Sequence, residues 1–112
     1  MNEVVIFITS GSEKEAKELA RILVEEKLAA CVNILSGVES LYWWKDKIES
    51  SKEWLLVAKT QGKMANKVVK RVKEIHSYEV PEVIALPIVE GNKDYLRWIS
   101  DALALRKKKG DL

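Results

Sequence analysis

The sequence predicts an α+β fold, in which two strand–helix–strand units build one antiparallel sheet that carries both helices on the same face. The first observation behind this prediction is a continuous apolar run at residues 4–9, VVIFIT, followed by an amphipathic stretch. The second is that the same order of apolar run, threonine and amphipathic stretch returns roughly fifty residues later. The third is a polar break at residues 45–47, where a hairpin joins the two units.

The first unit starts with residues 4–9 as a buried strand and continues into a helix. Ser12 and Glu15 match the S-x-x-E capping box that marks a helix start. The helix then presents one apolar face, formed by Ala16, Leu19, Ala20 and Leu23. Residues 28–35 (LAACVNIL) and 38–44 (VESLYWW) are two further apolar segments, and Ser36 and Gly37 interrupt the pattern between them.

The second unit repeats this order. Residues 54–60 (WLLVAKT) and 83–89 predict strands. The helix between them has an apolar face formed by Met64, Ala65, Val68, Val69, Val72 and Ile75. Together the units give the βαββαβ order of the ferredoxin-like fold. Pro87 lacks the N–H that a sheet ladder requires, which places the last strand at a sheet edge or bends it.

A short third helix is predicted after the second unit. Asn92 is a typical N-cap, and the helix has an apolar face formed by Tyr95, Leu96, Ile99, Ala102 and Leu103. The length of 112 residues suits one core, so residues 1–105 are expected to form a single domain. Residues 106–112 contain the run RKKKG and are expected to form a basic, flexible tail.

The composition favours a soluble chain of the cytoplasm. Apolar residues make up 47% of the chain, but no apolar run approaches the length of about eighteen residues that a membrane span needs. The start, MNEVVIFITS, has no signal-peptide pattern. The lone Cys31 forms no internal disulfide, which fits a reducing compartment. A charged content of 32% with a single glutamine is found in many proteins from hot environments, as well as in others, and suggests thermostability.

The charge distribution argues against nucleic-acid binding. The net charge is +2, but residues 106–109 supply four positive charges. Residues 1–105 therefore hold 15 basic and 16 acidic residues. Nucleic-acid-binding domains usually have a clearly basic face, so no nucleic-acid partner is expected.

Three adjacent aromatic residues, Tyr42, Trp43 and Trp44, predict a subunit interface. Neighbours on a strand point to opposite faces, so these rings cannot all cover the helix layer. Large rings on an open sheet face form an apolar patch that a partner subunit would cover, most simply another copy of the chain. The alternative is that the rings complete the core of the chain itself.

The chain lacks the motifs of serine hydrolases, phosphate-binding loops, dinucleotide sites and zinc peptidases, so we expect neither an enzyme nor an organic cofactor. Cys31 and His76 are the only candidates for a nucleophile–base pair. Cys31, however, lies in the apolar run AACVN, where a thiol usually behaves as an inert small hydrophobe.

His76, the one histidine, has two interpretations. In the first, an exposed imidazole binds copper or another divalent cation weakly, with oxygen ligands such as Glu79 or Glu82. In the second, His76 closes the second helix, where an imidazolium interacts favourably with the helix dipole. Residues 77–82, which join the second helix to the last strand, are called the connector. Val80 precedes Pro81 and is held extended, so the connector is expected to be rigid.

Five blocks of the sequence resemble the CutA family of divalent-cation tolerance proteins in their order and spacing. They are LAACVNI (28–34), YWWKDKIE (42–49), LLVAKT (55–60), HSYEVPE (76–82) and YLRWI (95–99). The resemblance implies a ferredoxin-like fold assembled as a homotrimer, similar to the trimer of the PII signalling proteins. It also implies a role in tolerance of copper and other divalent cations, with no agreed enzymatic activity.

The chain departs from the family pattern at three places. Ser77 replaces a proline after the histidine, which leaves the connector less rigid. Asp46 stands where a turn glycine is common, and it is tolerable there if the backbone is left-handed. Residues 9–11 (TSG) stand where some members have a further cysteine, a candidate copper ligand. His76 is therefore the one metal-ligand position retained by motif.

Two functions are predicted. The first is a non-enzymatic trimer of divalent-cation tolerance or homeostasis that binds copper or a similar ion weakly through His76. The alternative is a signalling or scaffold trimer like the PII proteins, which binds a small ligand or a protein between subunits. In that case Lys59, Tyr78 and Glu82 line the ligand cleft.

Overall fold

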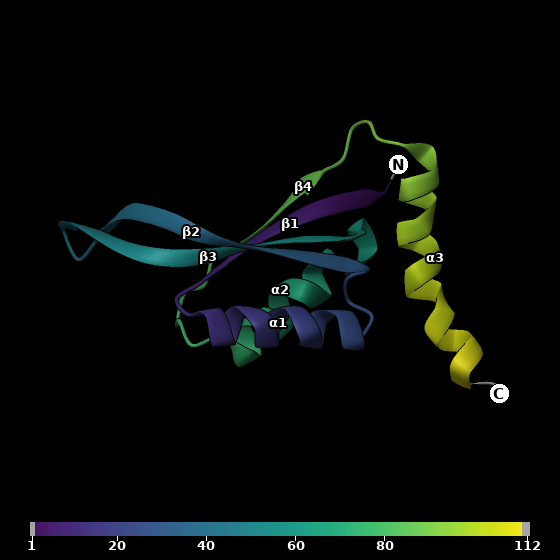
Figure 1. The fold of residues 1–112 in the computed structure, drawn as a ribbon, viewed down its shortest axis with the longest axis horizontal. Helices are drawn as coiled ribbons and strands as arrows, with labels where there is room; N and C mark the ends of the chain where they lie inside the picture. The colour runs from purple at the N-terminus through teal and green to yellow at the C-terminus, as the bar shows by residue number, and fades with distance from the viewer. Residues whose placement is uncertain (1, 111–112) are drawn as a thin grey trace.

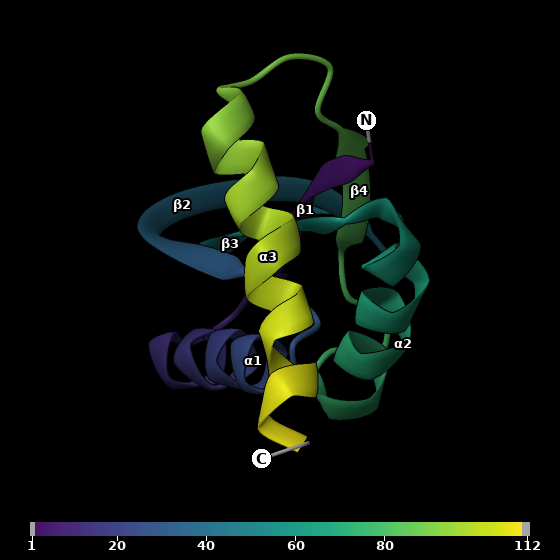
Figure 2. The ribbon, with the colours of Figure 1, turned by 90° about the vertical axis from the view of Figure 1, so that its right-hand side faces the viewer.

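The chain forms a four-stranded antiparallel sheet with two helices on one face and a third helix across one end (Figures 1 and 2). The computed structural model describes residues 2–110, with side chains up to residue 104. In chain order the elements are β1 (Glu3–Ser10), α1 (Glu13–Glu25), β2 (Cys31–Trp44), β3 (Lys47–Gln61), the short 3₁₀ helix Gly62–Met64, α2 (Ala65–Ile75), β4 (Val83–Pro87) and α3 (Lys93–Gly110). The strand order is β2-β3-β1-β4. The predicted α+β, ferredoxin-like βαββαβ fold with a C-terminal helix is confirmed.

The core lies between the sheet and the helices α1 and α2. Ile6 pairs with Ala58 and Ile8 with Leu56 across β1 and β3, and all four are fully buried. Because side chains alternate along a strand, the intervening residues point to the other side of the sheet, which we call the open face. The open face is apolar and includes Val5, Phe7, Leu55, Val57, Ile84 and Leu86.

α1 begins where the sequence predicts, but only half of the predicted capping box is present. Ser12 is extended (φ −148°, ψ 154°), and its hydroxyl accepts a hydrogen bond from the backbone N–H of Glu15 at 3.1 Å. The carboxylate of Glu15 does not complete the box. It accepts hydrogen bonds from Ser10 and Ser77 instead, and it therefore connects α1 to two other segments.

The predicted hairpin at residues 45–47 is confirmed. Trp44 pairs with Lys47, which leaves a loop of Lys45 and Asp46 with φ values of 51° and 66°. Two consecutive left-handed residues define the turn whose twist matches that of the flanking strands. Asp46 tolerates this conformation better than most residues, which explains how it replaces the usual glycine.

β2 and β3 are longer than predicted, and together they form an arm that projects beyond the helices (Figure 1). The predicted break at Ser36 and Gly37 is a bulge inside β2, where the register shifts between Leu35 and Val38 and Gly37 has φ 81°. β3 begins at Lys47 rather than at the predicted residue 54. We call residues 38–53 the arm. All residues from 41 to 50 are exposed, so this part of the arm lies outside the chain's own core.

The C-terminal part agrees with the prediction except in its lengths. β4 lies at an edge of the sheet and ends at Pro87, as that proline requires. Asn92 caps α3, since its side-chain oxygen accepts the N–H of Asp94 at 2.8 Å. α3 was predicted to be short but continues to Gly110. The predicted flexibility of residues 106–112 stays a prediction, and residues 111–112 lie outside the described residues.

None of the helices in the described part of the chain is long and apolar enough to cross a membrane.

Candidate functional site

His76 is the last residue of the turn that ends α2, and its imidazole is enclosed by the chain. Its backbone N–H donates to the carbonyl of Val72 at 2.8 Å, and its backbone is extended (φ −76°, ψ 146°). Nε2 lies 2.7 Å from the carbonyl oxygen of Thr9, and Nδ1 accepts the N–H of Tyr78 at 3.0 Å. A carbonyl oxygen only accepts, so Nε2 carries the proton and these two bonds describe the neutral imidazole.

The position of His76 corrects one prediction and confirms another. The imidazole was expected to be exposed and charged at the helix end, but its side chain is 0% exposed. The prediction that His76 closes α2 is confirmed, but the bond is made by its backbone N–H to Val72 and not by a charged ring. The bond from Tyr78 to the ring in addition anchors the connector. Both ring nitrogens are already used, so a metal ion at His76 would have to replace one of these hydrogen bonds.

Glu15 fastens the connector to α1. One carboxylate oxygen accepts the hydroxyl of Ser10 at 2.7 Å, and the other accepts the backbone N–H of Ser77 at 2.6 Å. Partial burial alone would raise the pKa of this carboxyl. The hydrogen bonds from Ser10 and Ser77 outweigh that effect, so the pKa of Glu15 lies below its ordinary value.

Tyr78 links the connector to the base of the arm by a hydrogen bond. Its hydroxyl donates to the carboxylate of Glu53 at 2.8 Å, and the other oxygen of Glu53 accepts the hydroxyl of Ser40 at 2.7 Å. Burial and the hydrogen bond to Glu53 raise the pKa of Tyr78 to about 12, so the phenol stays protonated and donates throughout the neutral range. The phenol lies so close to Gly11 that a Cβ atom there would be 2.7 Å from its oxygen.

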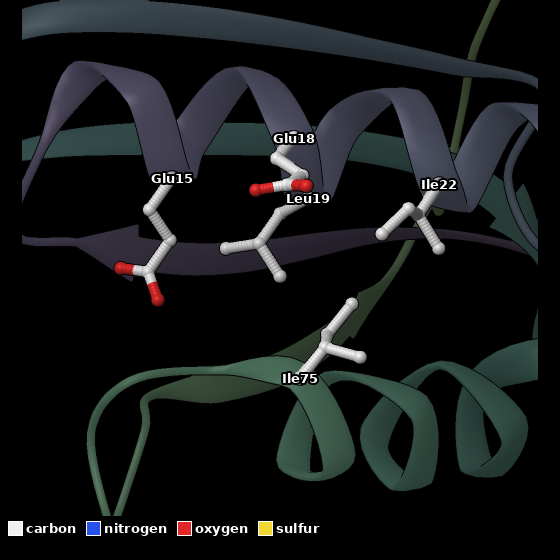
Figure 3. Close-up of a pocket in the computed structure, with 5 residues that line it drawn as sticks. All are labelled: Glu15, Glu18, Leu19, Ile22 and Ile75. Carbon is white, nitrogen blue, oxygen red and sulfur yellow. The ribbon is translucent and has the colours of Figure 1, made fainter.

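A shallow groove runs between α1 and α2 beside this network (Figure 3). Leu19 and Ile22 of α1 lie across it from Ile75 of α2, with the carboxylate of Glu15 at one end. The groove encloses about 290 Å³. It is apolar, with the carboxylates of Glu15 and Glu18 at its margin.

A second polar cluster lies at the opposite end of the sheet. The ammonium group of Lys59 donates to the side-chain oxygen of Asn33 and lies 4.0 Å from the sulfur of Cys31. Partial burial and the neighbouring thiol of Cys31 raise the pKa of Tyr95, whose ring stacks on Trp98 at a centroid distance of 5.6 Å. Cys31 is therefore half-buried among polar groups rather than enclosed in the apolar core.

The candidate residues of the sequence do not form one cleft within a single chain. Lys59 is six residues along β3 from Glu53, the partner of Tyr78, a separation of about 20 Å. Glu82 is exposed and directly precedes β4. Cys31 pairs with Lys59 opposite Val5, whereas His76 bonds to Thr9, about 13 Å further along β1, so Cys31 and His76 do not form a pair. Among the described residues, no group of three or more His, Cys, Asp or Glu side chains is arranged to hold a metal ion.

The aromatic residues of the arm are exposed. The exposed fractions are 41% for Tyr42, 72% for Trp43 and 52% for Trp44. Trp43 pairs directly with Ile48, and Leu41 follows on the same face of the arm, so three large apolar side chains form one patch. The alternative that these rings complete the core of the chain itself is wrong.

Sequence reasoning missed the buried partner of Tyr78. Glu53 is only 8% exposed, but in the sequence it stands in the polar stretch ESSKE, which looks like solvated surface. Glu15 was recognised as a capping residue, but nothing local predicted its bond to Ser77, 62 residues away. The sequence around Gly11 indicates a loop, but it does not predict the close approach of the Tyr78 ring.

Comparison with known proteins gives the family. The family model described as "CutA1 divalent ion tolerance protein" matches residues 4–102. The "Divalent-cation tolerance protein CutA" of Thermus thermophilus is 48% identical over 99 residues, which cover 88% of this chain and 96% of that protein. This chain belongs to the CutA1 family. The resemblance seen in the five sequence blocks is thereby confirmed.

Solved structures of CutA1 proteins share the fold. The CutA1 structure from Thermus thermophilus superimposes with a TM-score of 0.85 at 48% identity, over 87% of this chain and 94% of that chain. The CutA1 structure from Oryza sativa gives a TM-score of 0.88 at 43% identity, over 91% and 94%.

Several relatives in the CutA1 family are longer than this chain. The matched region covers 56% of the chloroplastic CutA 1 protein of Oryza sativa, at 44% identity, and 52% of the human protein CutA, at 48% identity. A structure from Archaeoglobus fulgidus, at 40% identity, is described as a periplasmic CutA. The names of these relatives thus place CutA proteins in more than one compartment.

We expect His76→Ala to lower the free energy of unfolding by about 2–4 kcal/mol, because it leaves two backbone groups without their buried partner and opens a cavity. Urea denaturation measures the change. Lys73→Ala, an exposed substitution in the last turn of the same helix, is the control and should change stability by less than about 0.5 kcal/mol. Equal effects of the two substitutions would contradict the structural role of His76.

We expect Glu15→Gln to flatten the dependence of stability on pH in the acid range. The folded-state pKa of Glu15 lies below its ordinary value of 4.5, so its contribution is fully present above pH 4.5 and is lost as the pH falls through the folded-state pKa. Thermal unfolding between about pH 3 and 6 should show the largest loss in the variant at the upper end. Glu18→Gln, an exposed neighbour on α1, is the control, and a loss independent of pH would contradict this role of Glu15.

Proposed function

We propose that this CutA1 family member is a non-enzymatic homotrimer of divalent-cation tolerance or homeostasis that acts in the cytoplasm and binds copper or a similar ion weakly. The family match over residues 4–102 supports the cation-related role. The relative from Thermus thermophilus, which nearly equals this chain in length, is named a divalent-cation tolerance protein.

The observation that carries the trimer is the exposed apolar surface of a single chain. The patch of Leu41, Trp43 and Ile48 on the arm is exposed by 71%, 72% and 63%. On the open face of the sheet, Ile84 and Leu86 are exposed by 50% and 42%. Contiguous surfaces of this kind usually mark subunit contacts, and a copy of the same chain presents the complementary open face.

The proposed metal binding at His76 is weak because it competes with the fold. To coordinate an ion, Nδ1 would have to give up the N–H of Tyr78, or Nε2 would have to give up its proton and the bond to Thr9. Glu15 offers a carboxylate as an oxygen ligand, 3.7 Å from Nδ1. An ion bound by these two groups would therefore accompany a local opening of the connector.

The alternative function is that of a trimer like the PII signalling proteins, with a ligand held between subunits. One observation bears on it: Lys59 lies towards the opposite end of the sheet from Tyr78 and Glu82, so these three residues form no cleft within one chain. Only the juxtaposition of two copies would bring them into one cleft. In this alternative, Lys59 supplies a positive charge for an anionic ligand.

Sedimentation equilibrium tests the assembly. We expect a mass of about 38 kDa, three times the 12.8 kDa of one chain. Trp43→Ala should weaken assembly by about 2 kcal/mol or more, about 30-fold in the dissociation constant, because buried tryptophans dominate interfaces. Trp98→Ala, a ring of equal size that is 44% exposed on α3, is the control. A stable monomer at dilute neutral conditions would contradict the trimer.

Calorimetric titration with copper and with nucleotides separates the two functions. We expect weak copper binding by the wild-type chain, most of it absent in His76→Ala and unchanged in Lys73→Ala. Copper binding that is equal in His76→Ala would remove His76 as a ligand. Nucleotide binding that depends on Lys59, without copper binding, would favour the signalling alternative.

A further inference from the structure

The arm is attached to the body of the molecule through a short base. From Leu41 to Ser50 every residue is exposed, so nothing in the chain's own core fixes the direction of this segment. At the base, the bulge at Ser36 and Gly37 increases the local bend of β2, and Gly37 has a left-handed backbone. Such a junction needs a further contact if the arm is to hold one angle.

Glu53 supplies that contact at the first residue pair beyond the bulge, where it lies opposite Val38. Its carboxylate is held from two sides, by Ser40 on the arm itself and by Tyr78 on the connector. Glu53 is 8% exposed, and a buried carboxylate needs its hydrogen-bond donors. The bond from Tyr78 is the one that crosses from the connector to the arm.

Tyr78 is itself held rigidly. Its backbone N–H donates to the imidazole of His76, and the two rings pack with their centroids 4.7 Å apart. The imidazole is in turn bonded to the carbonyl of Thr9 in β1. The preceding residue, Ser77, is fastened to α1 by Glu15. Gly11 leaves room for the phenol between these segments. A continuous set of hydrogen bonds therefore extends from β1 and α1 to the arm.

We propose that Tyr78 and Glu53 form a latch that fixes the angle of the arm and so presents Leu41, Trp43 and Ile48 to a neighbouring copy of the chain. Tyr78 is thus a positioning residue for assembly, although it lies outside the apolar patch. The presentation of the patch to another copy rests on the proposed homotrimer. The fixed angle of the arm is a property of a single chain.

Tyr78→Phe tests the latch because it removes one hydroxyl and keeps the ring. Ser40→Ala is the matched control, since it also removes one donor from Glu53 but leaves the connection between the connector and the arm. Glu53→Gln is a second variant in case Tyr78→Phe folds poorly. Two quantities are measured: hydrogen exchange of the backbone amides in residues 38–53, and the dissociation constant of the assembly by sedimentation.

We expect exchange in the arm to rise about tenfold or more in Tyr78→Phe, with little change in β1 and α1, and the dissociation constant to rise about tenfold. Ser40→Ala should change both by much less. Equal effects of Tyr78→Phe and Ser40→Ala, or a uniform rise in exchange over the whole chain, would overturn the latch. If the wild-type chain is monomeric but Tyr78→Phe still loosens the arm selectively, the latch stands and the trimer fails.

Discussion

The two hydrogen bonds of the His76 imidazole are the constraint on which this end of the molecule depends. They join β1, through the carbonyl of Thr9, to the connector, through the N–H of Tyr78. The residues they link to His76 are 67 and two positions away in the sequence, so one side chain closes both a distant and a local contact. The His76 side chain therefore contributes more to stability than an interaction with the helix dipole would, because each backbone partner would otherwise be left without its hydrogen bond.

The helix layer and the connector transmit this constraint to the rest of the fold. Glu15 receives hydrogen bonds from Ser10 before α1 and from Ser77 after α2, so the two helices are fixed at one end by a common carboxylate. At the other end Arg71 of α2 forms an ion pair with Glu26 at 2.9 Å. The groove between the two helices has apolar walls, with the carboxylates of Glu15 and Glu18 at its margin (Figure 3).

Most of the fold could be predicted from the sequence, because buried strands and helices require apolar residues at a regular spacing. The runs at residues 4–9 and 54–60 and the apolar helix faces all belong to the core, where alternation or helical spacing is obligatory. The first strand and the turn of the arm were predicted, but the start of β3 at Lys47 was not, because residues 47–53 are mostly polar and show no such period. The hydrogen bonds of the site could not be predicted for another reason. Tyr78 bonds to Glu53, and His76 bonds to Thr9, across segments that are distant in the sequence, and local patterns contain no information about such contacts. Family resemblance named the motif HSYEVPE but left the burial of its histidine open.

β2 is an outer strand of the sheet, 14 residues long, so one row of its backbone N–H and C=O groups faces away from its own sheet. An uncovered strand edge beside exposed rings is a template for indiscriminate pairing between chains. The bulge at Gly37 divides this edge into two shorter pieces of different direction, and the bent part departs from the flat geometry that extended stacking requires. The same irregularity that bends β2 therefore shortens the flat stretch of edge that is available for such pairing.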